Sequence, residues 1–496
     1  MRKKLKHVLA ALALCAVLTG SLAVPASAAG FQDVPAGHWA ADEIQRCVEK
    51  GFFNGQSATR FGLGEKMSRS AVAVVLCRFF GWENETPAEP TFSDVPADVW
   101  YAGAVEAAVR HGALTNSRGV FRPNDPVTRE ELAVMLVRAL GYGDIAGMAQ
   151  DLPMPFEDVV TNGGYIAMAY DLGLVSGTTA TTFAPANTAT REQVAVILMR
   201  LYDKLNGTGP EVIGVVSAES DLIGLDIAAI PAVSAFALSM KVNIDADVAA
   251  GLQAAARETG AKAFLYMGAG TGTMSSAPDK MAPLIADEVK KGGYDGLILD
   301  IPGLSESKAA TLNKLVRAVD QKLGGLPFYL VTEAPSRAGK NYGGYQYEKL
   351  NACVDRFILR IPAVEEVSEA FVVAPIDSPE DLYYALSTVE EQVGKDKVAL
   401  MLNTRMEVWV KGVSAGLSEH SLKELLAAES TKIYYSDRYE CAYLMGADEL
   451  GKPLTAWYLT EEDVESRIRL ARSMGVGQIC VSDWDAATEA FLAGLN

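Results

Sequence analysis

A carboxylate at the end of a buried strand is the first candidate for chemistry in this sequence. The segment Tyr294–Gly303 (YDGLILDIPG) holds a short apolar run between Asp-Gly and Pro-Gly, and a long helical pattern follows it. A strand that is apolar on both faces belongs to a parallel sheet covered by helices, and functional residues of such sheets lie where the strands end. The sequence therefore predicts a site around Asp300.

Glu333 is a second carboxylate in a comparable position. The apolar run Phe328–Val331 predicts the next strand, and Glu333 comes just after it. Any polar residue at such a position is, by itself, more often a helix cap, a salt bridge or a solvated loop residue. As a group, however, these polar residues predict a site at the end of the sheet where the strands finish, together with one indole ring that can stack on a sugar. The residues are Asp300, Glu333, Arg360, Asn403, Arg405, Asp483 and Trp484.

Alternating strand and helix patterns position these residues. Eight parallel strands interleaved with helices predict an α/β TIM (β/α)8 barrel over residues 211–496. The connection between the first two predicted strands is short and poorly helical. The apolar runs that predict the strands are Val212–Val216, Val233–Leu238, Ala263–Met267, Leu297–Leu299, Phe328–Val331, Phe357–Ile361, Val398–Leu402 and Ile479–Val481.

The segment around Asp300 resembles the DGxxxDxE signature of spore-wall members of glycoside hydrolase family 18, the chitinase-like enzymes. Asp295, Gly296 and Asp300 fall on the first Asp, the Gly and the last Asp, whereas Pro302 occupies the place of the catalytic Glu. The resemblance implies a reaction in which that Glu protonates the leaving oxygen while the N-acetyl group of the sugar attacks. Proline cannot act as the acid.

A second part of the family's pattern is also missing. Where the family has MxYD, the sequence has Leu359–Ala363, which contains neither Tyr nor Asp. The resemblance therefore implies a barrel that keeps the fold, has lost catalysis and binds glycan, with Asp295 and Asp300 as vestiges. Two alternatives stay open: an active glycosidase of cell-wall or other polysaccharide in which Glu333 is a displaced acid, and a structural component of a surface layer.

The preceding part of the chain repeats one pattern three times, with a period of about 60 residues. Each copy opens with an FxDV motif, continues with an amphipathic helix that ends at a Gly, and has a second helix that begins at Ser or Thr. The predicted segments are a signal peptide at 1–28, repeats at 29–88, 89–152 and 153–207, and the barrel at 211–496.

The starts of the second helices carry capping signals. Thr128 with Glu131 and Thr190 with Gln193 predict capping boxes, in which the hydroxyl accepts a backbone N–H and the side chain three residues later returns a bond. In the first repeat Ser68 is the cap, without a box. The next residue in each copy is Arg (Arg69, Arg129, Arg191), beside the positive end of the helix dipole, where an anionic ligand is favoured.

These features resemble S-layer homology domains. The resemblance implies an all-α unit of pseudo-threefold helical repeats whose grooves bind secondary cell-wall polysaccharide, often pyruvylated, and peptidoglycan as the wall partner. The alternative for each Arg is a capping salt bridge, but Arg suits a carboxylate through its bidentate fork. The residues expected to contact the wall polymer are Asp33, Trp39, Arg69, Asp94, Trp100, Arg129, Asp158, Tyr165 and Arg191.

The N-terminus predicts export. Arg2–Lys6 is basic, Val8–Leu22 is apolar and Ala26–Ala28 offers an A-x-A cleavage site, which together indicate a signal peptide. No later run of about 18 apolar residues predicts a membrane span. The formal net charge of −18 becomes more acidic when the basic leader is removed, which argues against nucleic acid or an anionic membrane as a partner.

Cysteines and histidines are too scattered to suggest a disulfide framework, a metal site or a cofactor. Cys47 and Cys77 could pair within the first repeat, but each also lies on an apolar helical face, the commoner position of a lone Cys. His38, His111 and His420, the histidines that remain after the leader, are far apart, so we expect no zinc site.

Overall fold

The computed structural model describes two compact units that divide after Asn206. The signal peptide predicted at 1–28, and the predicted site residue Arg405, lie outside the described residues. The described residues are 30–116, 119–149, 154–207, 209–217, 220–232, 244–268, 277–336, 343–361, 375, 377–404, 406–410, 413–418, 425–426, 430–447 and 451–495.

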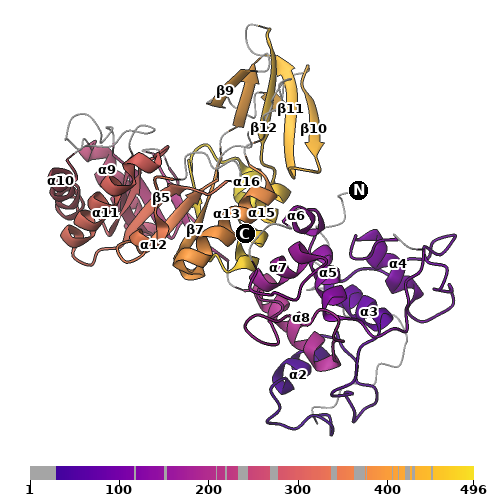
Figure 1. The fold of residues 1–496 in the computed structure, drawn as a ribbon. Helices are drawn as coiled ribbons and strands as arrows, with labels where there is room; N and C mark the ends of the chain where they lie inside the picture. Colours follow the sequence, from indigo (N-terminus) through magenta and orange to yellow (C-terminus); the bar gives the residue numbers. More distant parts are fainter. Residues whose placement is uncertain are drawn as a thin grey trace. The chain divides into compact units, whose positions relative to one another are not determined.

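The N-terminal unit is built from helices joined by loops and isolated β-bridges (Figure 1). The second helix of each repeat packs on the first helix of another: α3 on α4, α5 on α7 and α8 on α2. The three repeats therefore meet at three junctions. The helices are α2 (Ala41–Glu49), α3 (Arg69–Phe80), α4 (Ala102–Arg110), α5 (Arg129–Ala139), α6 (Gly143–Met148), α7 (Gly163–Asp171) and α8 (Arg191–Leu205).

The predicted capping residues start the second helices. Thr128 Oγ1 accepts the N–H of Glu131 at 3.1 Å, and Glu131 accepts the N–H of Thr128 at 3.0 Å, so this capping box is confirmed. In the third repeat, Gln193 accepts the N–H of Thr190 at 3.1 Å. Ser68 caps α3 without a box, as predicted. These bonds satisfy backbone groups that a helix start would otherwise leave open.

A cycle of three backbone hydrogen bonds closes the repeats on one another. Met67 donates to Ala189 at 3.0 Å, Ala189 donates to Val127 at 3.0 Å, and Val127 donates to Met67 at 2.8 Å. Each of the three residues belongs to a different repeat and lies just before a second helix. We call this cycle the closure ring. It joins the third repeat to the first, so the unit is cyclic instead of an open stack.

The C-terminal unit is a closed barrel of eight parallel strands in the order β1-β13-β7-β6-β5-β4-β3-β2. The eight strands run in parallel because a helix or a longer crossover returns the chain between neighbours. Their bounds are β1 (Glu211–Val215), β2 (Ile227–Pro231), β3 (Lys262–Gly268), β4 (Gly296–Asp300), β5 (Phe328–Glu333), β6 (Arg356–Arg360), β7 (Val398–Leu402) and β13 (Gln478–Val481).

The second barrel strand is not where the sequence pattern predicted it. The predicted run Val233–Leu238 lies outside the described residues, and β2 is formed by Ile227–Pro231, which precedes it. Its register is fixed by both neighbours, because Ala229 pairs with Val215 on one side and with Phe264 on the other. The prediction chose the most apolar local run, but the position of the strand is set by its pairing with β1 and β3, which a local pattern does not show.

Helices cover the barrel, and apolar side chains fill it. The interior cluster takes alternate residues of the strands, among them Phe264, Ile298, Val331 and Ile358. This period of two is expected where one face of each strand points inward. The described helices of this unit are α9 (Ala246–Thr259), α10 (Pro278–Lys291), α11 (Ala309–Leu323), α12 (Tyr347–Leu350), α13 (Pro379–Val393), α15 (Glu461–Met474) and α16 (Glu489–Ala493).

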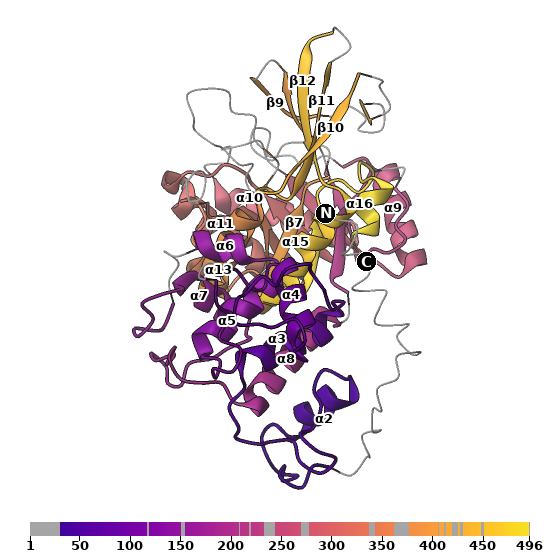
Figure 2. The same ribbon diagram turned by 90° about the vertical axis from the view of Figure 1, so that its right-hand side faces the viewer.

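An antiparallel five-stranded sheet is inserted between β7 and α15, which the sequence analysis missed. Its strand order is β10-β11-β12-β8-β9, and it stands at one end of the barrel in Figures 1 and 2. One face carries its own apolar cluster, including Val408, Leu444 and Tyr458. The strands are β8 (Met406–Val410), β9 (Val413–Ser418), β10 (Lys432–Ser436), β11 (Cys441–Ala447) and β12 (Pro453–Tyr458).

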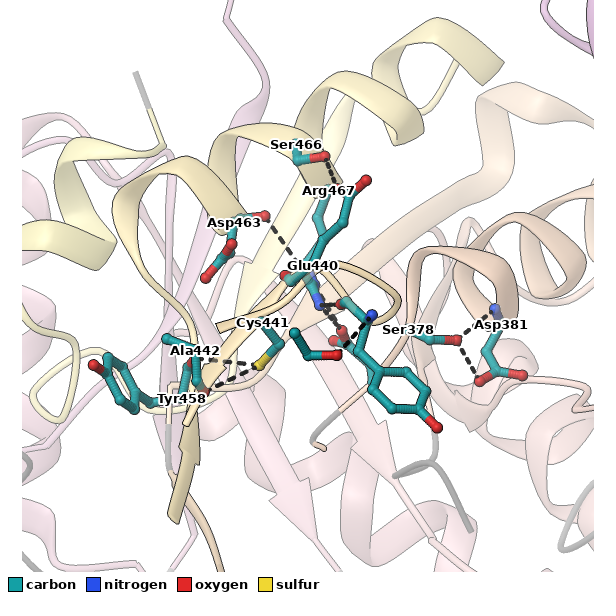
Figure 3. A network of polar contacts seen from close by, with 12 residues as sticks. Ser378, Asp381, Glu440, Cys441, Ala442, Tyr458, Asp463, Ser466 and Arg467 are labelled. Carbon is teal, nitrogen blue, oxygen red and sulfur yellow. Dashed lines mark hydrogen bonds and ion pairs between the residues drawn. The ribbon is translucent and has the colours of Figure 1, made fainter. Parts of the chain in front are cut away.

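A buried arginine, Arg467, joins the β10–β11 turn of this sheet to the helices of the barrel (Figure 3). Arg467 on α15 is 1% exposed, and its Nε donates to Asp377 at 2.6 Å. Its Nη1 donates to the carbonyl of Glu440 at 3.0 Å, in the turn between β10 and β11. Glu440 has a φ of 43°, an uncommon value for a residue with a side chain. We call this group of contacts the Arg467 clasp.

In the part of the chain that the structure describes, none of the helices combines the length and the apolar character required to span a bilayer.

Candidate functional site

A polar layer lies directly above the apolar interior of the barrel. Each of its four members follows an interior residue by two positions on its strand, so its side chain points to the same inner face. We call these residues, which come from four neighbouring strands, the polar layer: Tyr266 on β3, Asp300 on β4, Glu333 on β5 and Arg360 on β6.

Asp300 is the centre of the polar layer. It is 5% exposed, and its Oδ2 accepts hydrogen bonds from both the Tyr266 hydroxyl and the Arg360 guanidinium. Its Oδ1 is buried and has no hydrogen-bond partner among the residues that the structure describes. Burial and the Asp300 carboxylate raise the pKa of Tyr266 well above its ordinary value. Burial alone would lower the pKa of Arg360, but Asp300 outweighs that effect and raises it.

Glu333 places a carboxyl group beside the loop that contains Pro302. Its Oε2 accepts the backbone N–H of Gly303 at 2.9 Å. Burial raises the pKa of Glu333 above the ordinary 4.5, while the Gly303 N–H and Arg360 act in the opposite direction. A carboxyl from β5 thus reaches the residue next to Pro302, where the resemblance places the catalytic Glu at the end of β4.

The other predicted mouth residues follow β7 and β13. Asn403 Oδ1 accepts the Ser482 hydroxyl at 3.3 Å, and Trp484 donates its indole N–H to the carbonyl of Asp221 at 2.6 Å. Asp483 accepts the N–H of Ala486 at 3.2 Å. Sequence analysis missed Tyr266, which lies inside an apolar run. Its position two residues after an interior Phe is the signal that could have found it.

Asp295 does not belong to this mouth. It precedes β4, at the opposite end of the strand from Asp300, and its carboxylate accepts the N–H of Ala263 at 2.8 Å. Asp226 and Asp355 likewise accept the N–H groups of Val212 and Phe328, at the starts of β1 and β5, at 2.7 and 2.8 Å. The structure therefore gives Asp295 a role in joining strands, which a resemblance to the first Asp of a signature could not reveal.

The predicted Asp residues of the repeats hold loops of their own repeats. Asp33 accepts N–H groups of Phe61, Gly62 and Leu63 at 2.7–3.1 Å. Asp94 accepts those of Phe121 and Arg122, and Asp158 those of Phe183 and Ala184, all at 2.7–2.8 Å. The bonds to Phe183 and Ala184 lower the pKa of Asp158, against its desolvation. These carboxylates are committed to backbone donors.

The predicted Arg residues reach across the junctions between repeats. The Nε of Arg69, Arg129 and Arg191 donates to the carbonyl of Phe121, Phe183 and Phe61, respectively, at 2.7–2.9 Å. Each guanidinium also lies over the ring of that Phe. Burial lowers the pKa of each Arg. The side chains that we expected to point outward to a ligand thus turn onto the neighbouring repeat.

Second contacts of these Arg residues differ between junctions. Arg69 Nη1 forms an ion pair with Glu131 at 2.6 Å. Arg129 and Arg191 instead donate an Nη2 to the carbonyls of Ser176 and Asn54, at 2.6 and 2.9 Å. The alternative of a salt bridge at the helix start therefore describes the first junction and not the other two.

The aromatic residues predicted to line the grooves differ in exposure. Trp39 is 60% exposed and Trp100 is 70% exposed. Tyr165 is 9% exposed, and its hydroxyl accepts Arg138 Nε at 3.3 Å. Cys47 and Cys77 are buried and unpaired, so they form no disulfide.

Comparison with known proteins identifies the repeats. The family model described as the S-layer homology domain matches residues 30–73, 91–133 and 155–195. An S-layer protein of Bacillus thuringiensis subsp. finitimus is 31% identical over 220 residues, which is 43% of this chain and 26% of that protein. The exoglucanase XynX of Acetivibrio thermocellus is 29% identical over 182 residues, 36% of this chain and 16% of that protein. The chain thus spans about a quarter or less of these relatives.

Solved structures resemble the barrel. A chitinase from Chromobacterium violaceum has a TM-score of 0.49 and 15% identity, and the match covers 58% of this chain and 98% of that one. The spore cortex-lytic enzyme SleL of Bacillus cereus has a TM-score of 0.46 and 15% identity over 58% of this chain and 75% of that one. Three segments of the N-terminal unit are therefore S-layer homology domains, and a closed barrel of eight parallel strands follows them.

Proposed function

We propose that the protein is exported and held at the cell surface by its N-terminal unit, an all-α set of pseudo-threefold repeats bound non-covalently to secondary cell-wall polysaccharide. The observation that carries this proposal is the presence of three S-layer homology domains. The S-layer relatives support the surface location. Exposed Trp39 and Trp100 are available to stack on sugar rings, which large aromatic side chains do at binding surfaces.

Sedimentation with purified cell-wall sacculi tests the anchoring. The full secreted chain should sediment with sacculi that keep their polysaccharide and stay in solution when the polysaccharide has been extracted. Sedimentation that is equal before and after extraction would place the contact on another wall component. Failure to sediment with either preparation would contradict the anchoring itself.

For the barrel we propose glycan binding without cleavage. Pro302 removes the acid that the family 18 resemblance requires, and positioned acid catalysis typically supplies about 10² to 10⁴ in rate. The polar layer, with Arg360 and Glu333 partly exposed, supplies donors and acceptors for sugar hydroxyls. A purely structural role in a surface layer is the alternative in which neither unit recognises a soluble sugar.

A displaced acid is the second candidate, and one contact favours it. The bond from Gly303 to Glu333 brings a carboxyl group to the loop of Pro302. The raised pKa of Glu333 would keep more of it protonated near neutral pH, as a general acid requires. The test is release of reducing sugar from chitin and from peptidoglycan by the full chain. Turnover that disappears in Glu333→Gln would establish the displaced acid, whereas no release from either substrate agrees with binding alone.

A further inference from the structure

We propose that the three junctions of the N-terminal unit are not equivalent, and that a pocket at the junction of α3 and α4 is the site that receives an acidic sugar of the wall polymer, with Arg78 as its cation. This inference rests on the proposed anchoring function. It assigns the ligand's acid group to Arg78 instead of to the Arg residues at the helix starts.

A pocket of about 370 Å³ lies at this junction. That volume lies in the range of small-molecule sites, whose lower limit is about 300 Å³. Its lining combines two indole rings, an amide, a cation and aliphatic carbon: Val74, Cys77, Arg78, Gly81, Trp82, Asn84, Trp100 and Ala104. Aromatic rings with a few polar groups are the composition that sugar recognition requires.

Packing contacts hold the side chains that line the pocket in place. Trp82 is 9% exposed, and its ring is stacked on His111 with centroids 4.6 Å apart and planes 3° apart. Trp100 is 70% exposed and forms part of the lining. Gly103 permits the close approach of Asn84, because a Cβ on Gly103 would lie 2.8 Å from the Asn84 Cβ. One buried and one exposed indole therefore line the same pocket.

Arg78 provides the formal charge of this pocket. It lies in the last turn of α3, and within the described residues it makes no hydrogen bond or ion pair. Burial raises the pKa of Cys77 to about 12, so the thiol stays neutral. Of the two acids that follow α3, Glu85 is paired with Arg110, and Glu83 is exposed and does not line the pocket. A free guanidinium beside neutral walls favours a carboxylate, which it can hold in a bidentate contact.

The same positions are occupied differently at the other junctions. Arg138 corresponds to Arg78 in the second repeat, ten residues after the capping position, but it donates to the Tyr165 hydroxyl and to Thr115. Tyr165, on α7, is buried beneath it. At the junction of α8 and α2, Arg200 is at the place of Arg78, but Lys204 is at the place of Trp82, and an ion pair between Arg46 and Asp203 crosses the interface. The Arg residues at the helix starts are held by the closing contacts at all three junctions.

The test compares matched variants of the full secreted chain in sedimentation with sacculi. Trp100→Ala should weaken binding about tenfold or more, the loss expected for an aromatic residue at the centre of a contact. Trp39→Ala is the matched comparison and should cause a smaller loss, because Trp39 has the same place in its own repeat and a similar exposure but does not line this pocket. Arg78→Gln should weaken binding about tenfold, and Arg200→Gln, the corresponding change in the third repeat, should not.

A competition experiment identifies the acid group. Glucuronic acid should displace the parent chain from sacculi at a lower concentration than glucose does, and Arg78→Gln should abolish the difference. Equal losses in Trp100→Ala and Trp39→Ala would overturn the inequivalence of the junctions, and normal binding by Arg78→Gln would overturn the assignment of the cation. In both cases the parent chain would still sediment, so the anchoring proposal would stand.

Discussion

The repeats and the barrel mouth both carry functional-looking Asp and Arg residues, but the hydrogen-bond partners of these residues differ between the two regions. In the repeats, the Asp33 carboxylate is filled by backbone N–H groups and the Arg191 guanidinium by backbone carbonyls. In the barrel, Asp300 and Arg360 bind each other, and within the described part of the chain one Asp300 oxygen has no hydrogen-bond partner. A carboxylate that is bonded to backbone groups stabilises the fold, whereas a carboxylate oxygen without a hydrogen bond can accept one from a ligand. The residue type alone therefore does not identify a ligand site.

The largest expected effect comes from a buried pair whose partners are both side chains. Asp377→Ala would leave Arg467 buried without its acid, and breaking such a pair typically costs about 3–5 kcal/mol. We expect hydrogen exchange in α15 and in the β10–β11 turn to rise strongly in this variant. The control is Asp287→Ala, which removes an exposed pair with Lys291 and should change stability by less than about 1 kcal/mol. Unchanged exchange at α15 would contradict the role assigned to the clasp.

A smaller effect is expected at the closure of the repeats. Arg191→Ala removes two hydrogen bonds from a charged donor to the carbonyls of Phe61 and Asn54. We expect a loss of about 1–3 kcal/mol in the stability of the N-terminal unit, measured by denaturant unfolding with a probe in that unit. A variant that keeps its stability but loses wall binding would instead make Arg191 a ligand contact, and the contrast between the two regions would fail.

The smallest effect is a pH dependence at Glu333. Because burial raises the pKa of this acid in the folded state, the folded chain binds the proton more tightly than the unfolded chain does. The stability that this group contributes is therefore complete below its ordinary pKa of 4.5 and is lost as the pH rises through the folded value. Glu333→Gln should gain stability relative to the parent chain across that window. A difference that is independent of pH would contradict the raised pKa.

The sequence predicted the barrel largely because buried parallel strands are continuous apolar runs, and seven of the eight are close to the predicted positions. Asp300, Glu333 and Arg360 were predicted to lie together because they are at or just past the ends of such runs. Three features were not predictable in this way. The register of β2 depends on two distant strands, and Tyr266 is indistinguishable from a core residue in its run. The partners of Arg69, Arg129 and Arg191 lie 47 to 137 residues away.

The inserted sheet escaped prediction for a related physical reason. Its strands form a separate small apolar cluster, so they lack the continuous apolar runs of the barrel strands. Arg467 on α15 holds the sheet in place, and its partners come from two other segments: Asp377 precedes α13, and Glu440 lies between β10 and β11. A pattern within any one of those segments does not indicate the other two.

The closure ring has a consequence for the order of events when the chain is made. The first two junctions join residues 52 and 54 positions apart, whereas the third joins Arg191 to Phe61, 130 positions away. Contacts between distant residues form slowly, and the third cannot form until the last repeat has been synthesised. A chain that stops before Arg191 leaves the face of α2 that α8 covers open to solvent. During secretion, the N-terminal unit can therefore complete its folding only after its last repeat has crossed the membrane.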